Sequence, residues 1–205
     1  MKKNTKIVSL ISVASLVAVA ASPIVASAAT STADTTINVS VSAVISMTTS
    51  ATVALSLTPT GSGVVSSASD TVTVNTNNTT GYNLTVADSD ATTTLASGGN
   101  TFAASSGTKT APVSLANNTW GFAVATGTTG IGANGFDSSY SAESNNVSST
   151  SKWAGMPASG SPFLLKSTSA AATNDTTAVW YGAKATTAQP NGTYTDTVTY
   201  TATTN

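Results

Sequence analysis

The chain has 205 residues, of which 31 are Ser and 40 are Thr, and only 7% of the residues are charged. It contains no Cys and no His, its seven basic residues are all Lys, and its eight acids are seven Asp and one Glu, for a formal net charge of −1. The missing residue types exclude a Ser-His-Asp hydrolase, a thiol enzyme, an iron–sulfur cluster and an ordinary zinc site, and the lack of Arg and of basic clusters argues against nucleic-acid binding.

Residues 1–28 have the pattern of a secretory signal peptide. Three lysines within the first six residues precede an apolar stretch over residues 7–21. That stretch is about 15 residues long, which is shorter than the roughly 20 needed to span a bilayer. The small-x-small pattern Ala-Ser-Ala ends at Ala28. We therefore predict cleavage after Ala28 or Ala29, and a mature chain that is secreted or held at the cell surface without a membrane span.

Apolar residues alternate with small polar ones along most of the remaining chain. A period of two predicts antiparallel strands with one buried and one wet face, and Thr suits the wet face because it is β-branched. Gly, Pro and Asn residues between the runs predict turns. The alternating runs are residues 37–45, 53–57, 72–74, 82–86, 120–124, 179–183 and 194–200.

This pattern predicts one all-β domain over residues 29–205. Roughly seven to ten short strands with frequent turns are typical of an antiparallel β-sandwich of immunoglobulin-like or pilin-like type, with a jelly roll or another sandwich topology as alternatives. Residues 126–151, rich in Gly, Ser and Asn, fit no strand and predict a long loop. This loop either packs on the surface through its four scattered apolar residues or is flexible.

The first predicted strand, residues 35–46, is long, regular and close to the predicted new N-terminus. By composition it can pair within its own domain. It can equally complete the sheet of a neighbouring molecule by strand addition.

Two groups of short motifs resemble known families. Tyr181-Gly182 and the Pro-Asn-Gly turn and strand at 189–200 resemble the closing strands of spore-coat-U-like pilins, and residues 72–82 resemble that family's central strand. Residues 118–122, Asn-Thr-Trp-Gly-Phe, resemble WxL-like Ser/Thr-rich surface proteins. The cysteines usual in the pilins are absent, and there is no literal Trp-x-Leu. Either resemblance implies an extracellular sandwich used for assembly or adhesion.

Trp120, Trp153 and Trp180 are the candidate ligand-stacking or interface residues. Their flat apolar faces suit sugar rings, although aromatic residues more often pack in a core or anchor an interface. Trp180 is out of phase with Val179 and Tyr181, so it points to the opposite face of its strand. Either both faces are buried there, or an indole lies on the surface.

Other patterns do not define a catalytic, cofactor or metal site. Asp88 and Asp90 can contribute calcium ligands, but two acids at the end of a strand are more typical of a turn. Lys166 and Lys184 lie in predicted strands and are the candidates for a spontaneous Lys–Asn cross-link. We expect no catalytic residue, no cofactor and no metal.

The sequence therefore predicts a secreted or cell-surface, non-catalytic structural or adhesion protein of a bacterial envelope. Its expected partners are other envelope proteins, further copies of itself, or surface glycans, and not nucleic acid. Two alternatives stay open. One is a pilin-like subunit that polymerises by strand exchange through residues 35–46, and the other is a carbohydrate-binding module with exposed, roughly coplanar indoles.

Overall fold

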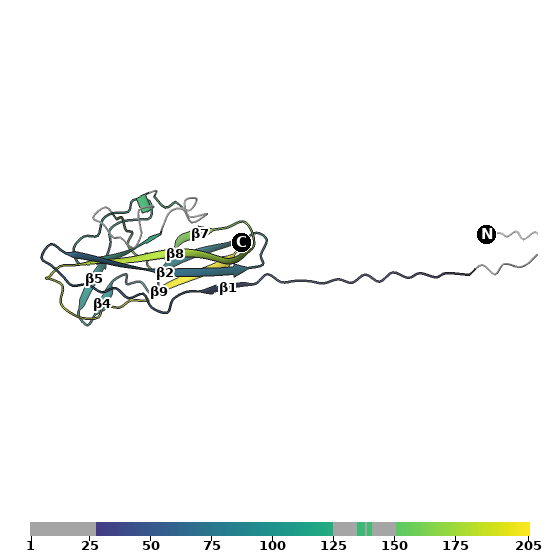
Figure 1. Cartoon of the computed structure of the whole chain (residues 1–205), viewed down its shortest axis with the longest axis horizontal. Coiled ribbons are helices and arrows are strands. Elements are labelled where there is room, and N and C mark those ends of the chain that lie inside the picture. Colours follow the sequence, from purple (N-terminus) through teal and green to yellow (C-terminus); the bar gives the residue numbers. More distant parts are fainter. Residues whose placement is uncertain (1–27, 125–134, 138, 141–150) are drawn as a thin grey trace, which may run out of the picture. The chain divides into compact units, whose positions relative to one another are not determined.

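The computed structural model describes most of the chain, namely residues 28–124, 135–137, 139–140 and 151–205. The chain divides into two units, Met1–Ser40 and Val41–Asn205. In the first unit the described residues, which begin with Ala28 and Ala29, are exposed and form no strand. The predicted signal peptide otherwise lies outside the described residues. All the strands belong to the second unit (Figure 1).

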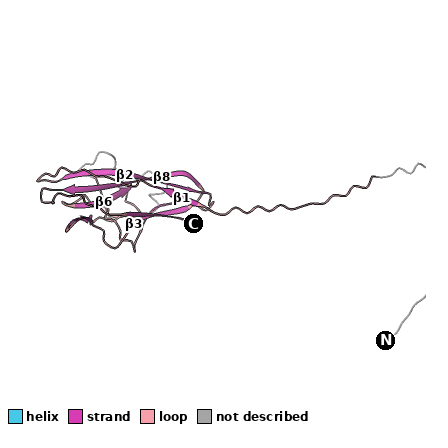
Figure 2. Cartoon of the chain, turned by 90° about the horizontal axis from the view of Figure 1, so that it is seen from below, coloured by secondary structure: helices cyan, strands magenta, loops and turns pink. Residues whose placement is uncertain are grey.

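The described residues of the second unit contain nine strands and no α-helix (Figure 2). The strands are β1 (Ile45–Thr48), β2 (Val64–Thr76), β3 (Tyr82–Asp88), β4 (Leu95–Ser97), β5 (Asn100–Ala104), β6 (Thr119–Val124), β7 (Phe163–Ser167), β8 (Ala172–Ala185) and β9 (Val198–Thr204). They form a six-stranded sheet in the order β1-β2-β8-β6-β5-β4 and a three-stranded sheet in the order β7-β3-β9. The predicted all-β class is confirmed.

The longest strand pair is β2 with β8 in the larger sheet. They run antiparallel from Val64 opposite Ala185 to Thr76 opposite Ala172. Side chains on a strand point alternately to the two faces, and at the predicted run 72–74 both valines are fully buried while the threonine between them is only half-buried. The alternation predicted for these residues is confirmed.

Both sheets contribute to one hydrophobic core. Tyr82, Leu84 and Val86 of β3, in the smaller sheet, are fully buried and belong to the same cluster as the buried residues of β2, β6 and β8. The rings of Phe122 on β6 and Phe163 on β7 lie 6.0 Å apart between centroids, which joins the two sheets directly. The alternation predicted for residues 82–86 is therefore confirmed. The predicted core positions in 120–124 and 179–183 are also buried, but the residues between them on β6 are buried too.

The face of the larger sheet that points away from this core is also covered at one place, where a glycine of β6 lies opposite a glycine of β8. Gly121 lies opposite Gly182, and a Cβ atom at Gly182 would lie only 2.5 Å from the Trp153 indole. Trp153 is itself 1% exposed. The side chain thus packs directly on bare backbone, which only glycine permits at this distance. Both faces of β8 are buried at this point.

Only part of the predicted long loop, residues 126–151, is described. Phe136 and Tyr140 are buried, and their rings pack edge to face with centroids 5.4 Å apart. The other two apolar residues of the loop, Ile131 and Val147, lie outside the described residues. Phe136 and Tyr140 therefore attach the described part of this segment to the core, as the packed alternative requires.

Beyond the N-terminal segment, the structure differs from the predicted strands in three places. Residues 53–57 keep their alternation, with half-buried Val and Leu side chains, but the described chain gives them no strand partner. The last strand begins at Val198, since Thr195 is held instead in an isolated bridge with Ala96. Strands β5 and β6 pair in parallel, not antiparallel, because the chain crosses over between them instead of turning in a hairpin.

Candidate functional site

The N-terminal segment carries a row of exposed aliphatic side chains. Ile37, Val39 and Val41 are 84%, 83% and 80% exposed, and Val44 follows at 63%. These residues are four of the five large apolar side chains that are exposed in the described chain. Ile37, Val39 and Val41 stand on alternate positions, whereas Val44 is out of phase with them. Alternate aliphatic side chains are typical of a strand that packs one face against a partner.

Within the described chain, the predicted strand over residues 35–46 pairs only at its end, because pairing begins at Ile45. The reason is the length of the partner strand. Ile45 lies opposite Thr76, which is the last residue of β2, and the chain then turns away at Asn77. No backbone of β2 is left to pair with the residues before Ile45.

Strand β9 has a free edge on the smaller sheet. It pairs with β3 over its full length, from Val198 to Thr204, and has no second strand partner within the described parts of the chain. The sequence of β9 is Val-Thr-Tyr-Thr-Ala-Thr-Thr. It contains none of the lysines or prolines that commonly protect edge strands from pairing with another chain.

Residues 51–59 form a second strand-like segment, which has no hydrogen-bonded partner strand in the described structure. Val53, Leu55 and Leu57 are half-buried and pack against the core, while the residues between them are exposed. Within the described structure, the backbone of this segment makes no hydrogen bond. A segment that alternates like a strand but has unpaired peptide groups is able to accept a neighbouring strand.

Asp70 brings the start of this segment close to β9. The Thr49 hydroxyl and the Ser50 amide both donate hydrogen bonds to the Asp70 carboxylate. Burial raises the pKa of the Tyr200 hydroxyl on β9, and a neighbouring tyrosine and the Asp70 carboxylate raise it further. Strands β1 and β9 also contact each other (Figure 1). Residues 51–59 therefore begin beside the free edge of β9.

A pair of acidic side chains lies where β3 ends and the chain approaches β9. Asp88 is 1% exposed, and one carboxylate oxygen of Asp88 and one of Asp196 are buried without a hydrogen-bond partner in the described chain. Burial, together with the carboxylates of Asp88 and Asp90, raises the pKa of Asp196 to about 6, against the opposing amide hydrogen bond from Thr197.

We expect Asp196→Asn to stabilise the protein at neutral pH. The pKa of Asp196 in the folded chain lies above the ordinary value of about 3.9, so protonation favours folding. That contribution is complete below about pH 4 and is lost as the pH rises through about 6. After allowance for the partial exposure of the side chain, we expect a melting temperature about 2–4 °C higher than wild type at pH 7.5, or about 1 kcal/mol.

Thermal unfolding followed by circular dichroism at pH 4 and at pH 7.5 checks this prediction. The difference between Asp196→Asn and wild type should disappear at pH 4. Asp34→Asn, which removes an exposed carboxylate from the N-terminal segment, is the matched control and should change neither temperature. A melting temperature of Asp196→Asn equal to that of wild type at both pH values would contradict the prediction.

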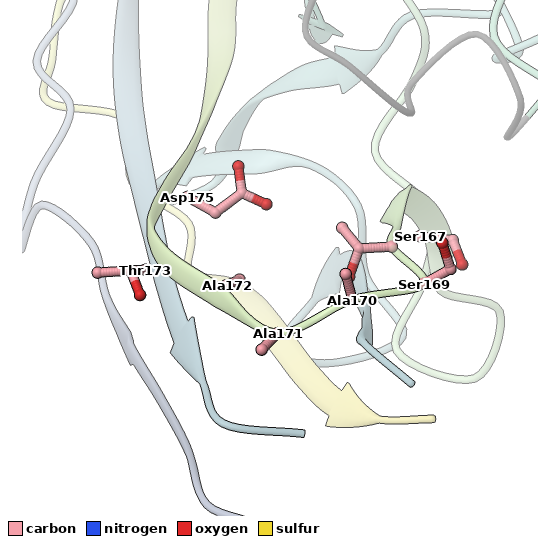
Figure 3. A pocket seen from close by; sticks show the side chains of 8 residues that line it. Ser167, Ser169, Ala170, Ala171, Ala172, Thr173 and Asp175 are labelled. Carbon is pink, nitrogen blue, oxygen red and sulfur yellow. The ribbon is translucent and has the colours of Figure 1, made fainter. Parts of the chain in front are cut away.

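Lys166 forms a buried ion pair that joins the two sheets. The Lys166 ammonium on β7 contacts one oxygen of Asp175 on β8, and the Tyr82 hydroxyl on β3 donates to the other oxygen at 2.8 Å. In Figure 3, Asp175 lies at a shallow pocket that is otherwise lined by the Ser, Thr and Ala residues 167–173. Because both oxygens of Asp175 are engaged, its carboxylate has a structural role. Lys166 faces an acid and not the Asn that a Lys–Asn cross-link needs, and Lys184 lies half-buried on β8.

The three candidate tryptophans do not form a common surface. Trp120 is 2% exposed, and its indole nitrogen donates to the Thr93 carbonyl at 3.0 Å. Trp153 is packed over Gly182, as described above. Trp180 is half-buried on β8. Trp120 and Trp153 thus serve packing, and Trp180 is the remaining candidate for contact with a ligand or partner.

Comparison with models of protein families, with curated proteins and with solved structures finds no match to this chain. In the described ranges, no group of three acidic side chains is placed to hold a metal ion. The same residues include no helix of the length and apolar character that a membrane crossing requires.

Sequence reasoning missed the pairing of Asp88 with Asp196. The sequence predicts a turn at Asp88 and Asp90, and the structure has a bend there, in which the Asp90 amide donates to the Asp88 carboxylate at 3.2 Å. The available signal was strand parity. Asp88 lies two positions after Val86, which faces the core, and Asp196 lies two positions before Val198. Because alternate residues of a strand face the same side, both acids are expected to point toward the core.

Proposed function

We propose that this protein is a secreted or cell-surface structural protein of a bacterial envelope, folded as an immunoglobulin-like β-sandwich, that catalyses no reaction. The signal-peptide pattern of residues 1–28 supports secretion. The absence of His, Cys and Arg from the whole sequence supports a non-catalytic role. Two sheets that share one core support a sandwich.

We further propose that copies join one another through the N-terminal segment, which is the pilin-like alternative. The observation that carries this proposal is the exposed row of Ile37, Val39 and Val41. Burying one such side chain is worth about 1.5–3 kcal/mol. Three of them in water on one strand-like segment are therefore better explained by a partner than by a free tail.

Size-exclusion chromatography and electron microscopy test this function on two chains. The chain from Ala29 should form oligomers or fibres, and a chain that begins at Val44 should be a folded monomer. Truncation at this point keeps β1, which starts at Ile45, and removes the exposed row. If the shorter chain unfolds, the segment is needed as an internal strand and the assembly proposal is wrong.

Matched substitutions separate the two faces of the segment. Replacing Ile37, Val39 and Val41 together by Ser should abolish assembly, because the apolar face would be lost. Replacing Asn38 and Ser40 by Ala should preserve it, because these residues occupy the other face of an extended chain. Equal assembly of both variants would show that the apolar row is not the contact.

The carbohydrate-binding alternative has less support. It requires several exposed and roughly coplanar indoles, whereas Trp120 and Trp153 are buried. We therefore do not favour it.

A further inference from the structure

The core-facing side chains of β9 lack apolar neighbours on the side of its free edge. On β3, which has neighbours on both sides, Tyr82, Leu84 and Val86 are fully buried. On β9, Tyr200 and Ala202 point to the same core but are only half-buried. The difference marks the position where a further strand would complete the smaller sheet.

The apolar side chains of residues 51–59 are also only partly covered by neighbouring residues. Val53, Leu55 and Leu57 pack against the core from one side and stay half-buried. Their backbone is unpaired in the described structure, and the segment starts beside β9 at the Asp70 junction. A strand lying between β9 and residues 51–59 would pair with the first and cover the half-buried side chains of both.

The N-terminal segment has the composition that such a strand needs. In an extended chain Ile37, Val39 and Val41 fall on one face, and Asn38, Ser40 and Ser42 fall on the other. Residues 35–43 contain no charge and no proline, so nothing in them opposes pairing with the uncharged β9. The stretch is also longer than β9, which has seven residues.

The connection to β1 favours a strand from another copy. The Val44 amide donates to the Asn77 side chain at 2.7 Å, and the Asn77 amide group donates to the Ser42 carbonyl at 3.0 Å. These bonds hold residues 42–44 extended in line with β1. A segment that returned to its own β9 would have to reverse here, yet residues 39–44 contain no Gly, Pro, Asn or Asp to form a tight turn.

We propose that residues 35–43 of one copy add as a strand to the free edge of β9 in a second copy, between β9 and residues 51–59. This inference rests on the assembly function proposed above and specifies the surface that accepts the segment. Backbone hydrogen bonds to β9 would provide the attachment, and the aliphatic row would provide the fit to the core.

Because the chain has no Cys, disulfide trapping can test the contact directly. One preparation carries Ser40→Cys, on the outward face of the donor segment. It is mixed with a second preparation carrying Thr199→Cys, Thr201→Cys or Thr203→Cys, three exposed positions on β9. Neighbouring residues on paired strands have Cβ atoms near the distance that a disulfide needs. We expect one of the three mixtures to give a cross-linked heterodimer under mild oxidation.

Two further mixtures are the controls. Ser40→Cys is mixed with Thr176→Cys, an exposed residue on β8, and with Ser46→Cys, an exposed residue on the β1 edge. Cross-linking to β9 should exceed both by about tenfold, because a bound strand raises the local concentration of its neighbour. A stronger cross-link to Ser46→Cys would place the segment on β1 and overturn the proposal while leaving the assembly function intact.

The remaining outcomes are also decisive. A disulfide that forms within one chain of the double variant Ser40→Cys/Thr201→Cys, in a monomeric fraction, would mean that each copy completes its own sheet. Monomers in every mixture would contradict the assembly function as well as this inference.

Hydrogen exchange gives a measurement that needs no introduced cysteine or other substitution. The β9 amides that face away from β3 should exchange at least about tenfold more slowly in the chain from Ala29 than in the chain from Val44. Unchanged exchange in an assembled sample would overturn the proposed acceptor.

Discussion

Asp175→Asn is expected to lower the free energy of unfolding by about 3–5 kcal/mol, because it leaves the Lys166 ammonium in the core without its ion partner. Lys166 is 2% exposed, whereas Asp175 is 26% exposed, so the lysine is the more costly of the two to leave unpaired. Its other hydrogen bond goes to the Thr176 carbonyl at 3.4 Å, which does not replace a carboxylate. The substituted protein should melt about 10 °C below wild type.

Urea and thermal unfolding followed by circular dichroism measure this effect. The double variant Lys166→Met/Asp175→Asn should recover most of the loss, because a buried ion pair can be replaced by groups that need no ion partner. Asp90→Asn, at an exposed position, is the matched control and should change stability by less than about 0.5 kcal/mol. A stability of Asp175→Asn equal to that of wild type would contradict the structural role of the pair.

Trp153→Ala is expected to cost about 3–5 kcal/mol in the free energy of unfolding. The indole is 1% exposed and rests on Gly182, which has no side chain of its own to fill the space. Chemical denaturation with a linear extrapolation gives the value. Trp180→Ala, at the half-buried tryptophan, is the matched control and should cost clearly less.

The same pair of variants tests the role assigned to the tryptophans. A ligand-binding tryptophan can be removed with little loss of stability, whereas a packing tryptophan cannot. If Trp153→Ala proved as stable as wild type, the packing role of this side chain would be wrong and the carbohydrate-binding alternative would regain support.

The central strands were predictable because their local pattern reflects burial. Val72 and Val74 on β2, and Tyr82 and Leu84 on β3, alternate with polar residues because one face meets the core. The shorter strands β4 and β5 have too few residues to show a period. The pairing of β5 with β6 and that of β7 with β3 join segments that are not consecutive hairpins, which local sequence does not reveal.

The candidate site was predictable only in part. The composition of residues 35–46 indicated a strand able to pair within its own domain or with a neighbouring molecule. Pairing with a neighbouring molecule remains a prediction. The sequence did not indicate that β2 ends at Thr76, which leaves the segment without a partner, or that β9 ends its sheet. The contact of Lys166 with Asp175 was equally hidden, because it depends on how the two sheets face each other.

The hydrogen bonds of Asn77 with Ser42 and Val44, which hold residues 42–44 in line with β1, also bear on how an assembly of copies would lengthen. If each copy gives a strand to the next copy and receives one from the copy before it, the contacts are heterologous, that is, head to tail. Such an array has direction, with an unfilled acceptor at one end and an unused donor at the other. Its length would then depend on whatever covers those two ends.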